Sequence, residues 1–297
     1  MAVYVNTNVS SLNGRRYLNN VQNQLTTTYQ RLSSGMRINS AKDDAAGLQI
    51  ADRLTTQING LNQGNRNTND GIALAQTIEG ALDETSNMLQ KIRTLAVQSA
   101  NGTNTQSDRD ALNAEAQSLV DEIGRIATQT KFGGKTVLNG ATTADTIYGT
   151  QANGTKGGTL TLQVGANKGD EINFTVANFS KFSKFGAAIN TKAYKDGKIT
   201  LNSAEGAKEV ISLMDSLISK VDGQRSGLGA IQNRLESSIR NQSNVAANQS
   251  DARSRIRDAD FAEESANLSQ QSIIQQAATS MLMQANSRPQ LALSMLG

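Results

Sequence analysis

One apolar seam, spaced alternately by three and four residues, extends from residue 207 to residue 259. Sixteen positions share this spacing and twelve of them are apolar. They are Ala207, Val210, Met214, Leu217, Val221, Gln224, Leu228, Ile231, Leu235, Ser238, Gln242, Val245, Gln249, Ala252, Ile256 and Ala259. A seam that stays in heptad phase over this length predicts a left-handed coiled coil. At 1.5 Å per residue the helix would be about 80 Å long, which a compact ball cannot contain without a break.

The first third of the chain contains a matching seam, so we expect two long helices packed antiparallel. Its positions are Ile50, Leu54, Leu61, Ala75, Ile78, Leu82, Leu89, Ile92 and Ala96. Gly64, Thr68 and Gly71 are expected to weaken it. A shorter helix is predicted next, with apolar residues at Leu112, Ala116, Leu119, Ile123 and Ile126.

Residues 131–203 have a different pattern, in which β-branched residues alternate with polar ones between Gly/Asn turns. We predict hairpins over about 135–180, with exposed loops or a small insertion at 142–158 and 180–198. The predicted fold class is therefore mainly α: a long antiparallel coiled-coil or helical bundle with a small β-hairpin region in the middle of the chain.

Helix starts are predicted where a capping residue stands three positions before a carboxylate. The four pairs are Ser40 with Asp43, Ser107 with Asp110, Asn202 with Glu205, and Asp260 with Glu263. The adjacent Asp43 and Asp44 are then first-turn carboxylates favoured by the helix dipole. A catalytic acid would need an apolar pocket to raise its pKa, and the neighbouring sequence supplies none.

The composition excludes most catalytic and metal chemistry. The chain has no Cys and no His, which removes disulfides, thiol nucleophiles, His-based triads and His- or Cys-liganded metals. We predict that the protein is not an enzyme and has no cofactor, metal or catalytic residue. Lys and Arg number 29 against 26 Asp and Glu, and they are interspersed, so we predict no nucleic-acid partner.

The same sequence predicts no membrane insertion, because no stretch approaches 18 apolar residues. The first twenty residues contain no apolar segment of the kind found in a secretory signal. We therefore expect no cleavable signal peptide.

Both ends of the chain have a single apolar stripe on an otherwise Asn/Gln/Ser-rich helix. The predicted assembly seams are Leu18, Val21, Leu25, Leu32, Phe261, Leu268, Ile274, Met281, Leu291 and Leu296. One amphipathic helix alone is marginal in water, so we expect the ends to be poorly ordered in an isolated chain and to fold when they meet partners. Both termini should arrive at the same end of the rod.

Several long motifs occur in order: "VNTNVSSLNGRRYLNN", "RLSSGMRINSAKDDAAGLQIADRL", "ALDETSNMLQKIRTLAVQSANGT", "FGGKTVLNG" and "IRDADFAEESANLSQQSIIQQAATSMLMQANSRPQLALSMLG". Over essentially its whole length the chain resembles bacterial flagellin. The resemblance implies a structural subunit that self-assembles into the extracellular flagellar filament for swimming motility. It implies an inner core domain of the terminal helices, residues 1–44 and 256–297. The next domain outward is a helical bundle with a β-hairpin region, residues 45–255, whose β/loop region is at about 131–203. The short middle implies a short form without the large outer domains of many flagellins.

The resemblance also implies partners besides further copies of the chain. These are an export chaperone that binds the C-terminal segment, the filament cap and junction proteins, and the type III export apparatus. A host Toll-like receptor is implied at Lys91, Leu95, Gln98 and Glu115. The family has Arg at the position of Lys91, and Lys lacks the planar fork of Arg. The alternative is that these four are ordinary bundle-surface residues.

Two other functions remain open on sequence grounds. A hook–filament junction protein or another minor filament protein shares the terminal helices, and a secreted coiled-coil adhesin would lack assembly-specific ends. An inserted metalloprotease is excluded by the absence of His and the short middle. Only the filament subunit should grow polymer when seeds are added to the monomer.

Overall fold

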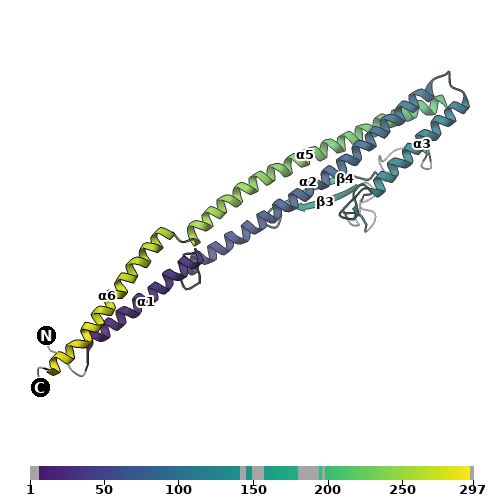
Figure 1. The fold of residues 1–297 in the computed structure, drawn as a ribbon. Helices are drawn as coiled ribbons and strands as arrows, with labels where there is room; N and C mark the ends of the chain where they lie inside the picture. The colour runs from purple at the N-terminus through teal and green to yellow at the C-terminus, as the bar shows by residue number, and fades with distance from the viewer. Residues whose placement is uncertain (1–6, 141–144, 149–156, 180–193, 196–197, 295–297) are drawn as a thin grey trace. The chain divides into compact units, whose positions relative to one another are not determined.

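The computed structural model describes residues 7–140, 145–148, 157–179, 194–195 and 198–294, without the side chains of 195 and 288–294. These residues form five helices, labelled α1 (Val9–Ser34), α2 (Ala45–Ala100), α3 (Gln106–Gln129), α5 (Ala204–Arg257) and α6 (Phe261–Ser294) (Figure 1). The strands are β1 (Lys131–Phe132), β2 (Lys135–Thr136), β3 (Gly157–Gln163), β4 (Glu171–Ala177), β5 (Tyr194–Lys195) and β6 (Lys198–Ile199). They form three two-stranded antiparallel sheets. The predicted fold class is confirmed.

The chain divides into two compact units. Unit 1 contains Met1–Ile58 and Ala246–Gly297, and unit 2 contains Asn59–Val245. The division falls inside α2 and α5, whereas the sequence predicted boundaries near their ends. The assignment of 1–44 with 256–297 and of 45–255 as functional domains stays a prediction.

Within unit 2, α2 and α5 are antiparallel, as the two seams predict. Arg93 Nε lies 2.6 Å from Asp215 Oδ1, and Arg225 Nη2 lies 3.0 Å from Asp83 Oδ1. Residue numbers thus fall along α2 as they rise along α5. These pairs are exposed and contribute little to stability, so the packing between the helices must come from their apolar faces.

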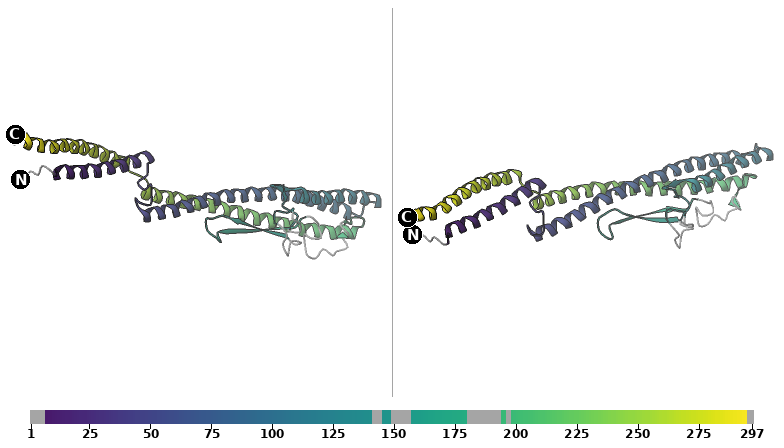
Figure 2. Two further views of the ribbon diagram at one scale, coloured as in Figure 1. Left: turned by 90° about the horizontal axis from the view of Figure 1, so that it is seen from below. Right: turned by 60° about the horizontal axis from the view of Figure 1, so that its bottom comes forward.

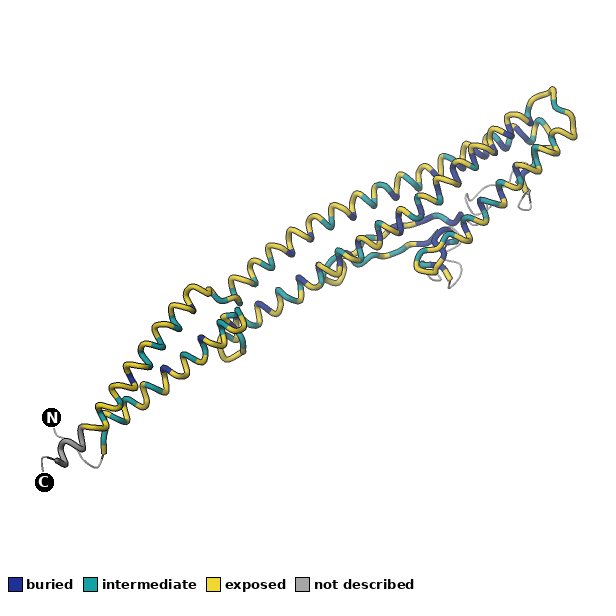
Figure 3. The backbone as a smooth tube through the Cα atoms, in the orientation of Figure 1, coloured by how far each residue is buried: buried dark blue, intermediate teal, exposed yellow. Residues whose placement is uncertain are grey.

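The predicted seam of α5 forms the centre of unit 2. Seven of its residues are at most 1% exposed: Ala207, Val210, Met214, Leu217, Val221, Leu228 and Leu235. All but Leu235 belong to one continuous buried cluster with residues of α2, α3 and β4, and the dark-blue segments in Figure 3 follow it. Burial of each Leu, Ile, Val or Met contributes about 1.5–3 kcal/mol, so this cluster is the main source of the unit's stability.

The prediction that the seams hold their phase throughout is wrong at two positions. Val245 is 36% exposed, while its neighbour Ala246 is buried. In α2, Ile50 is 47% exposed and Ala51 is fully buried. An ideal helix has 3.6 residues per turn, so along α5 the buried stripe drifts by about 20° per heptad and passes from Val245 to Ala246. This drift has the opposite sign at the start of α2 and does not explain the burial of Ala51.

The hairpin β3–β4 packs on α2 at the glycines that seemed to interrupt the seam. Its register pairs Gly157 with Ala177 and Gln163 with Glu171. A Cβ at Gly64 would lie 2.0 Å from the carbonyl oxygen of Val164, and a Cβ at Gly71 would lie 2.4 Å from Leu162 Cδ1. These glycines therefore leave the space that the hairpin fills, and the expectation that they only weaken the helix pair is wrong.

Gln224, a polar residue in the α5 seam, holds the other strand of this hairpin. Its Oε1 accepts a hydrogen bond from the Ala177 backbone N–H at 3.2 Å, and its Nε2 donates to the Thr175 carbonyl at 3.0 Å. One side chain thus satisfies two backbone groups of β4, as a neighbouring strand would.

The described part of the middle region is more ordered than the sequence predicted. Strand pairing begins at Lys131, before the predicted start at 135, and a third pair ends at Ile199. Residues 145–148 do not form an exposed loop, because Thr146 is fully buried and Tyr148 is 6% exposed. Burial raises the pKa of the Tyr148 hydroxyl, which donates to the Val137 carbonyl at 2.8 Å. The rest of the two predicted loops falls largely on 141–144, 149–156, 180–193 and 196–197, outside the described residues.

Each of the four predicted helix starts has a capping side chain of the predicted type. In three of the four helices the cap is a different residue from the one predicted. Asp260 Oδ1 accepts from the Ala262 N–H at 2.8 Å, as predicted for α6. Thr105 and Asp108 form the capping box of α3, two residues earlier than predicted. Ser203 Oγ accepts from the Gly206 N–H at 3.0 Å and caps α5, one residue later than predicted. Ser, Thr, Asn and Asp all favour the N-cap position, and several of them precede each helix of this chain. Packing therefore decides which of these neighbouring residues caps the helix.

Candidate assembly surface

Unit 1 is built around the antiparallel pair of α1 and α6 (Figure 2). Asn8 Nδ2 donates to the Ala285 carbonyl at 2.8 Å, and Arg31 Nη1 lies 2.9 Å from Glu264 Oε1. The first and last helices of the chain therefore lie side by side, as the sequence predicted for the two termini.

Short pairing between the segments that follow α1 and precede α6 fixes this arrangement. Met36 and Asp258 form an antiparallel bridge, and the Ala259 N–H donates to the Gly35 carbonyl at 3.0 Å. Gly35 ends α1 with φ of 70°, a conformation that favours glycine. A Cβ at Gly35 would lie 3.8 Å from the Phe261 ring, so the Phe261 ring lies beside Gly35 where α1 ends.

The adjacent carboxylates Asp43 and Asp44 lie just before α2 rather than in its first turn. Asp43 Oδ2 accepts from the Asn39 N–H at 3.1 Å and from the Ser40 N–H and Oγ at 2.9 and 3.0 Å. The hydrogen bonds from Ser40 and Asn39 lower the pKa of Asp43 below its ordinary 3.8. Asp44 Oδ1 accepts from the Gly47 N–H at 2.8 Å and caps α2. The pair is structural, although the predicted cap at Ser40 is four residues too early.

The predicted seam of α1 faces α6. Val21 is 4% exposed, and Leu18, Leu25 and Leu32 are half-buried. Thr28 occupies the fourth slot, is buried, and donates from Oγ1 to Gln271 Oε1 at 3.3 Å. The α1 seam thus packs within the chain but leaves much of its apolar surface uncovered.

The predicted residues of α6 divide into two groups. Leu268 and Ile274 are half-buried against α1, whereas Phe261 is 57% and Met281 is 72% exposed. The side chain of Leu291 and the whole of Leu296 lie outside the described residues.

An apolar groove lies between the N-terminal part of α1 and the C-terminal part of α6. Its lining residues are Ser10, Asn13, Gly14, Tyr17, Ile274, Ala277, Ala278, Met281 and Ala285. Small residues make the groove: a Cβ at Gly14 would lie 3.0 Å from Leu282 Cδ1, so the helices approach closely there. A groove of this composition suits an apolar side chain of a partner rather than a charged ligand.

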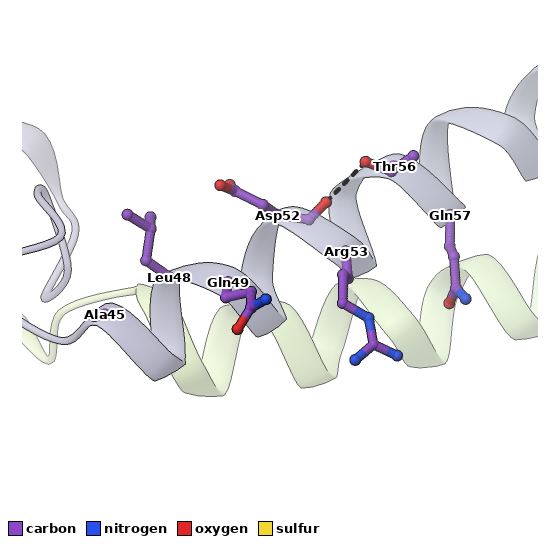
Figure 4. Close-up of a pocket in the computed structure, with 7 residues that line it drawn as sticks. All are labelled: Ala45, Leu48, Gln49, Asp52, Arg53, Thr56 and Gln57. Carbon is purple, nitrogen blue, oxygen red and sulfur yellow. Dashed lines mark hydrogen bonds between the residues drawn. The ribbon is translucent and has the colours of Figure 1, made fainter.

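Unit 1 has two other depressions, both open to solvent. One lies between α1 and α6 around the Arg31–Glu264 pair and is lined mainly by Asn, Gln and Thr side chains. The other lies on the first turns of α2 and is lined by Ala45, Leu48, Gln49, Asp52, Arg53, Thr56 and Gln57 (Figure 4). A single helix supplies all seven residues, so this depression cannot enclose a substrate.

Exposed large hydrophobic residues are concentrated in unit 1. Nine of the eleven found among the described residues lie there: Val9, Leu12, Tyr17, Tyr29, Ile50, Phe261, Ile273, Met281 and Met283. Sequence analysis missed Ile273 and Met283, which are 67% and 63% exposed. The sequence does contain a signal for this exposure, in the adjacent apolar residues Ile273–Ile274 and 281–283. Adjacent apolar residues place apolar surface on two faces of a helix, and one partner helix covers only one of them.

The predicted receptor patch lies in unit 2. Lys91 Nζ on α2 is 3.1 Å from Glu115 Oε1 on α3, and both side chains are about half exposed, at 59% and 48%. Gln98 is exposed. Leu95 is 7% exposed and belongs to the buried cluster, so the structure brings three of the four residues to the surface.

No group of three or more Asp or Glu side chains among the described residues is placed to hold a metal ion. Nor does any described helix have the length and apolarity needed to cross a membrane.

The fold and the exposed terminal helices define a mainly α structural protein with long paired helices. Two family models match the chain: the bacterial flagellin N-terminal helical region over residues 5–143, and the bacterial flagellin C-terminal helical region over residues 211–296. Polar flagellin C of Vibrio parahaemolyticus is 36% identical and flagellin B of Vibrio anguillarum is 37% identical, with 100% of both chains covered in each comparison. The chain belongs to the bacterial flagellin family.

As a flagellin, the chain is a structural subunit of the bacterial flagellar filament, outside the cell. The alignment with polar flagellin C extends over 386 residues, whereas this chain has 297, consistent with a short form that lacks large outer domains. A solved structure of a putative flagellar hook-associated protein from Vibrio parahaemolyticus has a TM-score of 0.57 and covers 73% of this chain and 100% of its own. Its 18% identity shows a shared fold alone.

Proposed function

We propose that unit 1 supplies the main contacts through which copies of this chain polymerise. One observation supports this assignment: nine of the eleven exposed large hydrophobic residues found in the described part of the chain belong to unit 1. Unit 2 buries its apolar residues in its own cluster. Exposed apolar surface of this extent marks a protein interface.

The seam residues then have two roles. Leu18, Val21, Leu25 and Leu32 hold α1 against α6 within one subunit. Phe261 and Met281, together with Ile273 and Met283, contact neighbouring subunits, and a neighbour's apolar side chain enters the apolar groove. Leu291 and Leu296 belong to the same proposed surface.

Such contacts make a filament because they are heterologous and do not close into a ring. Each apolar side chain that a neighbour covers contributes about 1.5–3 kcal/mol, and ordering the ends opposes this gain. Assembly should therefore depend on subunit concentration and on a nucleus.

Ile273→Asp tests the proposal. Ile273 is 67% exposed, so the change adds charge to the proposed interface and leaves the α1–α6 pair intact. We expect the variant to keep its helix content and to lose seeded polymerisation, measured by sedimentation and electron microscopy. The matched control is Asn173→Asp, which adds the same charge at an exposed position of β4 and should polymerise normally. Normal filaments from Ile273→Asp would refute the assignment of unit 1.

Seeded growth also separates this function from a hook–filament junction protein and from a secreted adhesin. A filament subunit lengthens the seeds in proportion to the added protein. A junction protein would bind seed ends and stop, and an adhesin would leave seeds unchanged.

Further partners belong to the same proposal. An export chaperone is proposed to bind the C-terminal segment, because α6 has exposed Ile273, Met281 and Met283 before it is covered in a filament. Filament cap and junction proteins are proposed to meet the same terminal helices, after type III export without a cleavable signal.

A host Toll-like receptor is proposed to contact Lys91, Gln98 and Glu115, which are exposed and come from adjacent parts of α2 and α3. Leu95 is expected to act indirectly, by packing under this patch. Lys91→Arg should strengthen receptor binding, because Arg offers a planar fork. An unchanged affinity would argue that these residues only form the bundle surface.

A further inference from the structure

The two most exposed methionines of the described chain lie two residues apart on α6. Met281 is 72% and Met283 is 63% exposed. Met214 is fully buried in unit 2, and Met36 and Met88 are half-buried. A thioether reacts with oxidants according to its exposure, so Met281 and Met283 should be the first described methionines to react.

These methionines lie on two different faces of the helix. Met281 lines the apolar groove beside Tyr17 and Ile274. Two residues further along a helix, a side chain is turned by about 200°, so Met283 points away from that groove, and it is 63% exposed. The two exposed methionine sulfurs therefore lie on opposite faces of α6.

We propose that Met281 and Met283 are oxidation sites at which hydroperoxides block polymerisation of the subunit. The sulfur lone pair attacks the distal oxygen of the hydroperoxide, the O–O bond breaks, and one oxygen atom is transferred to sulfur. The thioether is oxidised by two electrons to a sulfoxide. The leaving hydroxide or alkoxide takes up the proton of the transferred oxygen and becomes water or an alcohol, so the peroxide is reduced by the same two electrons.

The consequence rests on the proposed function of unit 1. A sulfoxide is polar and chiral, and its burial without a hydrogen-bond partner is costly. Oxidation thus removes the gain from covering each side chain, which corresponds to a rise of about tenfold or more in the subunit concentration needed for growth. Within a filament the same sulfurs are covered and should react slowly.

The experiment treats purified full-length subunits with hydrogen peroxide, locates sulfoxides by peptide mass spectrometry, and measures seeded growth. We expect sulfoxide at Met281 and Met283 before Met214, and a loss of growth that methionine sulfoxide reductases restore. Met281→Leu combined with Met283→Leu keeps both side chains apolar and of similar volume, and peroxide treatment should leave its growth at the level that the same variant shows untreated. Met36→Leu combined with Met88→Leu keeps both proposed sites and should lose growth as the unchanged chain does.

Three outcomes would overturn the proposal: unchanged growth of the oxidised subunit, loss of growth in the treated Met281→Leu/Met283→Leu variant, or equal oxidation rates of these sulfurs in subunits and in preformed filaments. The last comparison uses the unchanged chain and does not depend on folding of a variant. If untreated subunits fail to grow on seeds, the proposed function fails, whereas growth that survives oxidation refutes this inference alone.

Discussion

Arg31 on α1 and Glu264 on α6 form an ion pair, with 2.9 Å between Arg31 Nη1 and Glu264 Oε1, that joins the first and last helices of the chain. The Glu264 side chain is 8% exposed and the Arg31 side chain is 31% exposed. A carboxylate covered to this degree needs its partner, because an unpaired buried charge is costly. The pair therefore helps to fix how α1 and α6 align.

Arg31→Met should loosen unit 1. We expect a loss of about 1–3 kcal/mol in the stability of the α1–α6 pair, because Glu264 would be left buried without its cation. Hydrogen exchange of α6 amides measures this change. The control is Arg240→Met, which removes an exposed pair with Glu236 at 3.8 Å and should alter stability by no more than about 0.5 kcal/mol. Equal effects of the two changes would show that Glu264 needs no partner.

Gly64→Ala should destabilise unit 2, because the new methyl group would lie 2.0 Å from the Val164 carbonyl oxygen and displace the hairpin. We expect a loss of about 2 kcal/mol or more in urea unfolding. Gly80→Ala in the same helix is the control, because its Cβ would meet no described atom within 4 Å. That change should stabilise the helix by up to about 1 kcal/mol, and the opposite signs identify packing as the cause.

Gln224→Leu tests whether this position stabilises unit 2 as a residue of the apolar seam or through its hydrogen bonds to β4. An apolar residue at this seam position should strengthen the helix pair if the pattern alone mattered. The structure predicts the reverse for β4, because the Ala177 N–H and the Thr175 carbonyl would each lose a hydrogen bond. The expected cost is about 0.5–1.5 kcal/mol per hydrogen bond. Faster hydrogen exchange at Ala177 is the expected result, and unchanged protection there would contradict it.

Asp43 should give the turn before α2 a dependence on acid. Its pKa is lowered by hydrogen bonds from Ser40 and Asn39, so the folded turn favours the carboxylate. The stabilisation is present above the ordinary pKa of 3.8 and is lost as pH falls through the lower pKa of the folded state. NMR titration of the Asp43 carboxyl should show a midpoint below 3.8. In Asp43→Asn, exchange of the Ser40 amide should lose this acid dependence, and a midpoint at or above 3.8 would contradict the assignment.

Sequence patterns predicted the features that depend on residues close together in the chain. The α5 seam was correct at Val210, Met214 and Leu217 because a 3.5-residue period is a local property of one helix. The cap at Asp260 was correct for the same reason. The meeting of the two ends followed from the antiparallel arrangement expected of the two long helices between them.

Tertiary structure alone decided the contacts between distant segments. Gly64 and Gly71 accommodate a hairpin about a hundred residues away, and Gln224 binds the same hairpin; no local pattern distinguishes these residues from weak points in a seam. The exposure of Ile273 and Met283 likewise depends on which face of α6 meets α1. Periodicity states that a helix has an apolar side, but only the packed chain determines which apolar residues find a partner within it and which are left for another copy.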